Sequence, residues 1–126
     1  DGSGLTGIPK SIGLTIDGGG SAITTGVKGD ITIPFSGTIT GWYITADQAG
    51  SIVIDVWKDT LANFPPTVAD TIAGTEKPTL SGVAFNSDTS FTTFTGSVST
   101  GDVIRFNVDS VATVTRVNLV LNAITR

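Results

Sequence analysis

Carboxylates are the side chains with the most scope for chemistry in this sequence of 126 residues. Two pairs among the eleven acidic residues, Asp55 with Asp59 and Asp102 with Asp109, invite comparison with glycosidases. Those enzymes use one carboxyl group as general acid and a second as base or nucleophile. The pattern favours a structural role instead, because Asp102 stands at a predicted turn and Asp55 lies on a predicted strand near Lys58.

Other catalytic chemistries lack their residues, because the sequence contains no His and no Cys. No imidazole can activate a Ser nucleophile, and the usual ligands of zinc and iron are missing. Residues 17–21, DGGGS, lack the Lys and the following helix of a phosphate loop. Asp17 with Asp30, or the Asp47 turn, could offer oxygen ligands to calcium, but the spacing of a calcium loop is absent. We therefore expect no catalytic residues, no metal and no cofactor.

Charge and hydropathy limit the partners. The net charge is −4 and the seven basic residues form no patch, so we expect no nucleic-acid binding. No apolar run approaches the roughly 18 residues of a membrane span, and we expect no membrane insertion. The start shows no signal-peptide pattern. Since the sequence contains no Met, we expect a processed chain or a piece of a longer one.

Aromatic side chains are the other candidate site. Tyr43, Trp57 and Phe64 could stack on a sugar ring, because a flat apolar face with a polar handle suits a pyranose. Asp55 shares a strand face with Trp57 and completes the predicted ligand-binding set. The alternative is that the Trp residues belong to a core or interface, which we favour for Trp42.

Alternation of apolar and polar residues predicts an all-β, antiparallel β-sandwich of jelly-roll type. In residues 37–46 it places Ile39 and Tyr43 on one face, and residues 47–50 read as a tight turn. We expect a strand, linker or anchor in residues 1–20 and the sandwich in residues 21–126. The predicted strands are 11–16, 29–35, 37–46, 51–58, 102–110 and 113–124, with weaker ones at 79–83 and 90–95.

Residues 59–78 are predicted to be a long, partly ordered loop with a short helical turn near 67–72. Loops of this length are usually functional or disordered. The predicted loop contains enough apolar residues to pack on a surface, namely Leu61, Phe64, Val68 and Ile72. Residues 51–58 are apolar on both faces, so we expect this loop, or alternatively another subunit, to cover the Trp57 side.

The stretch from Gly18 to the end resembles a domain that recurs in virion proteins of tailed bacteriophages. The similarity rests on GVKGDITIPF (26–35), TITGW (38–42), GSIVIDVWKD (50–59), FPPTVADTIAGTEKPTLS (64–81) and GDVIRFNVDSVATVTRVNLVL (101–121). Residues 1–15 show no such likeness.

The resemblance implies a non-enzymatic virion protein, a surface module of a tail fibre or capsid fibre that acts in host attachment or particle decoration. It also implies a homotrimer, contacts with other virion proteins, and a host surface glycan or protein as partner. The alternative reading is a carbohydrate-binding module of a larger secreted bacterial protein. An enzyme is the weakest reading.

Overall fold

The structure of the chain is a computed structural model that describes residues 7–126. Its strands and two 3-10 helices are β1 (Pro9–Asp17), β2 (Gly26–Thr32), β3 (Gly37–Asp59), η1 (Leu61–Asn63), η2 (Val68–Asp70), β4 (Thr79–Asp88), β5 (Ser97–Val98), β6 (Val103–Ala112) and β7 (Arg116–Thr125). Within the described part of the chain, no helix is long and apolar enough to cross a membrane.

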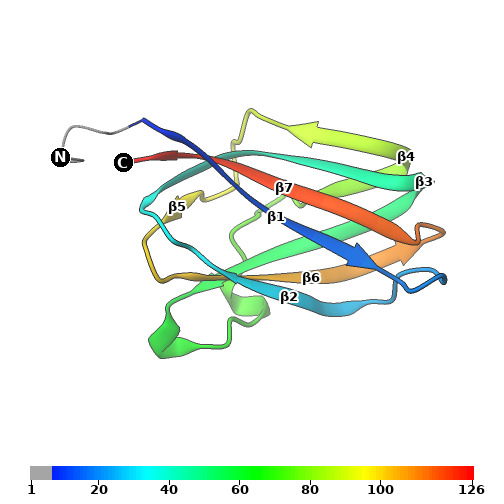
Figure 1. Cartoon of the computed structure of the whole chain (residues 1–126), viewed down its shortest axis with the longest axis horizontal. Helices are drawn as coiled ribbons and strands as arrows, with labels where there is room; N and C mark the ends of the chain where they lie inside the picture. The colour runs from blue at the N-terminus through cyan, green and yellow to red at the C-terminus, as the bar shows by residue number, and fades with distance from the viewer. Residues whose placement is uncertain (1–6) are drawn as a thin grey trace.

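The seven strands form one continuous antiparallel sheet. It curls into two halves, which we call the first and the second sheet and which share the long strands β3 and β4 (Figure 1). The first sheet has the order β1, β7, first half of β3, second half of β4. The second has the order β2, β6, second half of β3, first half of β4. Counting β3 and β4 twice gives eight strands in the order of a jelly roll. The predicted fold class is confirmed.

The core lies between the two sheets and is mostly aliphatic. Residues of alternate positions fill it, as a strand period of two requires. Phe106 and Ile44 are fully buried at its centre, and Trp42 belongs to it as expected. Burying each such side chain stabilises the fold by about 1.5–3 kcal/mol. Strand β1 contributes Ile12 and Ile16, so it is part of the same core.

A β-bulge changes the faces of β3 from those predicted. Its pairing with β7 shifts between Ile39 and Gly41. The extra residue turns Ile39, Trp42 and Ile44 all toward the core, while Tyr43 faces solvent. The prediction that Ile39 and Tyr43 share a face was therefore wrong.

The predicted turn at residues 47–50 was also wrong, since β3 continues through it from the first sheet to the second. Asp47 accepts hydrogen bonds from the backbone N–H of Thr115 and Arg116, across the molecule rather than within a local turn. Gly50 permits the passage, because a Cβ there would lie 2.7 Å from Cγ1 of Val114.

The weaker predicted strand at residues 90–95 is a loop. The backbone N–H groups of Thr92, Thr93 and Phe94 donate to one carboxylate oxygen of Glu76 instead of to a neighbouring strand. Strand β4 is longer than predicted, and the short β5 pairs with the start of β3.

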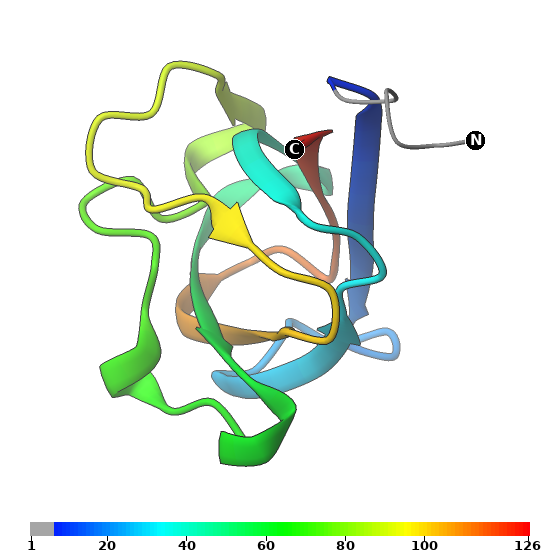
Figure 2. The same ribbon diagram turned by 90° about the vertical axis from the view of Figure 1, so that its left-hand side faces the viewer.

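Residues 60–78, which we call the strap, form an ordered segment that returns along β3. Figure 2 shows the strap on the side of the molecule opposite β1. The N–H of Ile72 donates to Val56 at 2.9 Å, and the N–H of Ile54 donates to Pro78 at 2.9 Å. The predicted helical turn appears as η2, and the Phe64–Pro65 bond is cis.

The apolar residues of the strap behave differently from the prediction. Of the four apolar residues expected to lie on a surface, Ile72 is buried, whereas Leu61, Phe64 and Val68 are 58, 49 and 66% exposed. The η2 turn is held by its own capping box between Thr67 and Asp70, so its stability does not need Val68 in contact with the sheet.

Candidate functional site

The four residues predicted to bind a ligand do not meet at one site. Tyr43 lies on the outer face of the first sheet and is 45% exposed. Asp55 and Trp57 lie on the outer side of the second sheet and are buried. Phe64 lies on the strap. The molecule therefore has two surfaces to consider, one covered by the strap and one open.

Asp55 is held by three short-range contacts. Its side chain is only 2% exposed. Its Oδ1 accepts hydrogen bonds from the hydroxyl of Thr71 at 2.5 Å and from the N–H of Val56 at 2.9 Å. Its Oδ2 lies 3.6 Å from Nζ of Lys77. A buried carboxylate is tolerated when it is paired and hydrogen-bonded in this way.

Lys77 joins Asp55 to a second carboxylate on β6. Its Nζ lies 2.7 Å from Oδ2 of Asp109, and the hydrogen bond to Asp109 raises the pKa of Lys77. Asn107 donates to the other oxygen of Asp109 at 2.7 Å. These groups connect the strap to the sheet, so their polar atoms are occupied by bonds within the protein.

Trp57 lies beside a second ion pair. It stands opposite Arg105 in the β3–β6 register, and Arg105 makes a two-pronged bond to Asp30 at 2.7 and 2.8 Å. The guanidinium also lies 5.4 Å from the centre of the Phe64 ring. The hydrogen bond from Arg105 lowers the pKa of Asp30. The strap thus covers the Trp57 side. Coverage by this loop was one of the two expectations from the sequence, the other being coverage by another subunit.

The indole nitrogen of Trp57 is a buried donor without a hydrogen-bond partner within residues 7–126. Trp57 is 9% exposed and lies outside the main core cluster. Because the strap covers it within one chain, the second apolar face of β3 gives no reason to require another subunit.

The carboxylate pairs considered for glycosidase chemistry are separated by their bonds. Asp59 accepts from the N–H of Thr60 and from Asn63, whereas Asp55 bonds to the strap. Asp102 pairs with Lys58 at 3.8 Å, whereas Asp109 pairs with Lys77. Across residues 7–126, no group of three or more His, Cys, Asp or Glu could hold a metal ion.

One pair of carboxyl groups does interact, Glu76 with Asp88. The hydrogen bond from Asp88 lowers the pKa of Glu76, with further lowering by the N–H groups of Thr93 and Thr92. The same bond raises the pKa of Asp88. The pair fixes the 89–94 loop against the end of the strap, which is a structural role.

The outer face of the first sheet, which we call the open face, has a different character. Leaving aside the residues at its two ends, the outward positions of this face on β1, β3, β4 and β7 carry no charged residue. Asp17 and Arg116, neighbours in the β1–β7 register, stand at one end of it. The outward residues are Ser11, Gly13, Thr15, Thr38, Thr40, Tyr43, Thr45, Phe85, Ser87, Asn118, Val120 and Asn122.

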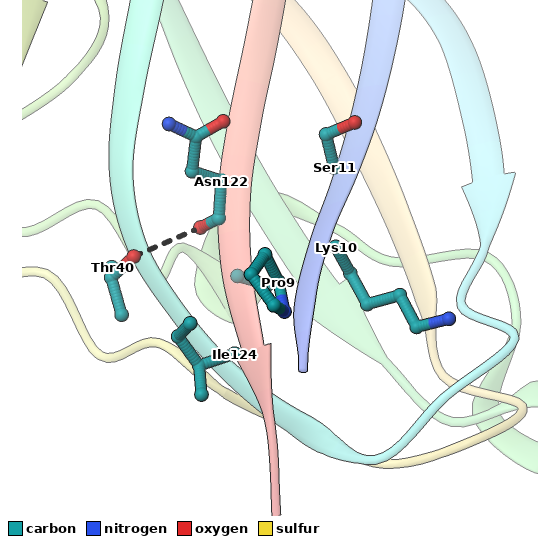
Figure 3. Close-up of a pocket in the computed structure, with 7 residues that line it drawn as sticks. Pro9, Lys10, Ser11, Thr40, Asn122 and Ile124 are labelled. Atoms are coloured by element: carbon teal, nitrogen blue, oxygen red, sulfur yellow. Dashed lines mark hydrogen bonds between the residues drawn. The ribbon is translucent and has the colours of Figure 1, made fainter. Parts of the chain in front are cut away.

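Two shallow hollows lie along β7 on the open face, between β1 and β3. The first, of about 430 Å³, is lined by Ser11, Thr40 and Asn122 among others. Figure 3 shows it, with the side chain of Lys10 directed away from Asn122. The second hollow, of about 450 Å³, is lined by Gly13 and Asn118 among others. Both hollows are open to solvent, so each could contact a ligand along one side only.

Tyr43 is thus the one predicted site residue that faces an open surface beside hollows. Sequence reasoning missed the rest of the open face, because it ranked residues by reactivity and by aromaticity. The available signal was the row of outward Thr and Asn residues, in TITGWYIT (38–45) and NLVLN (118–122).

Comparisons with known proteins give distant likenesses only. No family model and no curated protein matches the chain. A serine protease of Aeromonas sobria is 11% identical with a TM-score of 0.41, and the match covers 92% of this chain but 27% of the protease. The chain therefore spans about a quarter of that protein's length.

Two other solved structures come from a capsid and a binding module. A chain of the cyanophage Pam1 capsid is 13% identical with a TM-score of 0.35, covering 100% of this chain and 91% of that one. A CBM4 structure is 16% identical with a TM-score of 0.33, covering 97% and 82%. At these scores the likenesses carry no argument about function.

Proposed function

We propose that the chain is a non-enzymatic structural module of a bacteriophage virion. In this proposal it is displayed on a tail fibre or capsid fibre and acts in host attachment or particle decoration. The open face is its docking surface. The resemblance of residues 18–126 to a virion domain of tailed phages supports the virion location.

The observation that carries the docking role is the contrast between the two outer faces. On the second sheet, Arg105 pairs with Asp30, Asp109 pairs with Lys77 of the strap, and the strap covers Trp57. On the first sheet, Tyr43 and Phe85 are 45 and 75% exposed among hydroxyl and amide groups. Exposed aromatic side chains at uncharged positions are typical of surfaces that bind a partner.

The polar clusters support a role without catalysis. Asp55 is directed at Thr71 and Lys77, inside the protein, and lines neither of the two hollows described above. A catalytic acid or base must reach a substrate. Asp55 and Lys77 instead stabilise the packing of the strap.

A second candidate is a carbohydrate-binding module of a larger secreted bacterial protein. The same open face favours it, because Tyr43 with neighbouring Asn and Thr side chains suits a sugar. The two candidates differ in where the chain is found, on phage particles or within a secreted polypeptide.

The trimer that the resemblance implies belongs to the proposal. Light scattering on the purified chain measures it directly, with a mass of three times 12.9 kDa expected. A monomer would remove the trimer from the proposal but leave the docking face.

The test of the proposed function is the location of the chain. Purified particles of the phage that encodes it are analysed by quantitative mass spectrometry and by immunogold labelling in the electron microscope. The proposal predicts a fixed copy number per particle, with label at the fibre tips or over the capsid. Particles without the chain would overturn the virion role.

A further inference from the structure

We propose that the open face binds an uncharged oligosaccharide along strand β7, with Tyr43 as the stacking platform. This inference rests on the docking role proposed above and gives it a ligand class. The binding groove consists of the two hollows and the surface between them. No acidic or basic sugar is required by any group on this face.

The charge distribution selects an uncharged ligand. The described chain keeps its ion pairs on the second sheet, at Asp30–Arg105 and around Lys77. The cations of the open face stand at its edges: Lys10 lines the first hollow with its side chain directed away from Asn122 (Figure 3), and Arg116 lies at the end of β7 beside Asp17. The surface between them offers no cation to a uronate or sialate, while the net charge of −4 disfavours the approach of an anion. A ligand that presents hydroxyl groups and no charge matches this surface.

The polar groups of the groove are free to bind. Within the described part of the chain, the side-chain amide of Asn122 and the hydroxyl groups of Ser11 and Thr45 make no hydrogen bond. Asn118 accepts one bond, from Thr15 at 2.6 Å, and keeps its NH₂ donors. An Asn side chain offers both donors and an acceptor, as sugar hydroxyl groups require.

The shape of the groove fits a chain of sugars rather than one ring. The hollows at Asn118 and at Asn122 are four residues apart on β7, or roughly 13 Å at the rise of an antiparallel strand. Gly13 lacks a side chain and so leaves the second hollow open. On β3, Tyr43 lies between Thr40 of the first hollow and Thr45 of the second.

Tyr43 supplies the flat apolar surface. It pairs with Val120 across the β3–β7 ladder, and Phe85 pairs with Thr45, two residues along β3 on the same face. Apolar side chains therefore run across the sheet through the middle of a hydroxyl-rich surface. This arrangement combines ring stacking with hydrogen bonds on either side.

A second copy of the chain fits the open face less well. Stable interfaces between identical subunits are mostly apolar at their centre. Here Ser, Thr and Asn occupy most of the outward positions, and the large apolar side chains among them are Tyr43, Phe85 and Val120. Polar groups of this kind would need many matched partners in a protein interface.

The test is calorimetric titration of the full chain with four hexasaccharides, of glucose, xylose, mannose and galacturonate. We expect saturable binding of at least one of the three neutral probes and none of the galacturonate probe. The dissociation constant should not change between 50 and 500 mM NaCl, because no ion pair is formed. Failure of all three neutral probes, or preference for galacturonate, overturns the inference.

Variants locate the binding. Tyr43→Ala should weaken binding at least about tenfold, and Tyr43→Phe should restore it, since stacking needs the ring. Asn122→Ala measures the contribution of a second groove residue to binding. Phe64→Ala removes an equally exposed aromatic residue from the strap and should leave binding unchanged. Loss of binding with Phe64→Ala but not Tyr43→Ala would overturn the inference, as would a dimer that Tyr43→Ala dissociates.

The outcomes separate this inference from the proposed function. A chain that is present on virions but binds no neutral probe overturns only the ligand class. A chain that binds a neutral probe but is absent from virions overturns the virion role and keeps the groove. Thermal unfolding of each variant identifies any that fail to fold.

Discussion

Asp55 and Lys77 form an ion pair between a strand and the strap, with Oδ2 3.6 Å from Nζ. The Asp55 side chain is 2% exposed and that of Lys77 is 33% exposed. Thr71, also on the strap, donates to the same carboxyl group. The strap is therefore fixed to the second sheet by polar contacts on its returning half, while its exposed turn carries Leu61 and Val68.

Replacing Thr71 by Val tests this attachment. The variant keeps the shape of the side chain but removes the hydroxyl donor to the buried carboxylate of Asp55. Leaving such a group less satisfied should lower the free energy of unfolding by about 1–3 kcal/mol. Urea unfolding measures the change. Thr32→Val, an exposed position on β2, is the matched control and should change stability by less than about 0.5 kcal/mol; equal effects would argue against the attachment.

The lowered pKa of Asp47 should make the free energy of unfolding depend on pH. Hydrogen bonds from Thr115 and Arg116 lower the pKa of Asp47 from 3.8 to about 2 in the folded chain. Between these two values the unfolded chain binds more protons, so protonation favours unfolding. The stabilisation by Asp47 is thus complete above pH 3.8 and is lost as the pH falls through about 2.

The measurement compares thermal midpoints of the wild type and Asp47→Asn from pH 2 to 6. The variant should be less stable at pH 6, and the difference should shrink toward pH 2. A difference that stays constant over this range would show that the charge of Asp47 is not responsible.

Gly50 is predicted to be needed where β3 passes between the sheets. In Gly50→Ala the new Cβ would meet Cγ1 of Val114 at 2.7 Å and the carbonyl oxygen of Ala112 at 2.9 Å. We expect a loss of about 1–3 kcal/mol from this overpacking. Gly29→Ala is the control, since there the nearest atom is the flexible end of Leu14 at 3.2 Å. Equal denaturation midpoints for both variants would contradict this role.

Glu76 and Asp88 should titrate as an interacting pair. The bond to Glu76 raises the pKa of Asp88 above its ordinary value of 3.8. In Glu76→Gln the charged neighbour is removed, so the pKa of Asp88 should fall toward 3.8. Carboxyl-carbon NMR over pH 2 to 7 follows this directly. An Asp88 titration unaffected by the substitution would mean that the two groups do not share the proton.

The sequence predicted the fold class because alternation is strong wherever one face of a strand meets the core. Ile52, Ile54 and Val56 on β3, and Leu119 and Leu121 on β7, occupy the core as their spacing indicates. Local periodicity could not predict the passage of β3 through residues 47–50, because the hydrogen bonds of Asp47 join residues 68 and 69 positions away. The bulge near Gly41 shifted the faces for the same reason, since it depends on the partner strand.

The candidate site was less predictable than the fold. Tyr43, Asp55, Trp57 and Phe64 were selected as individual residues, and only the topology shows that Tyr43 lies on another sheet from Asp55 and Trp57. The open face is assembled from strands that are far apart in the sequence, such as β1 and β7. A row of Thr and Asn residues carries no strong chemical signal until those strands are placed side by side.

Docking through the open face is the role that we propose for the chain. The most direct measurement is the binding isotherm of fluorescently labelled chain on host cells and on phage particles that lack it. We predict saturable binding to at least one of these, weakened at least about tenfold by Tyr43→Ala and unchanged by Phe64→Ala. Equal binding by all three proteins, or no saturable binding to either target, would contradict the claim.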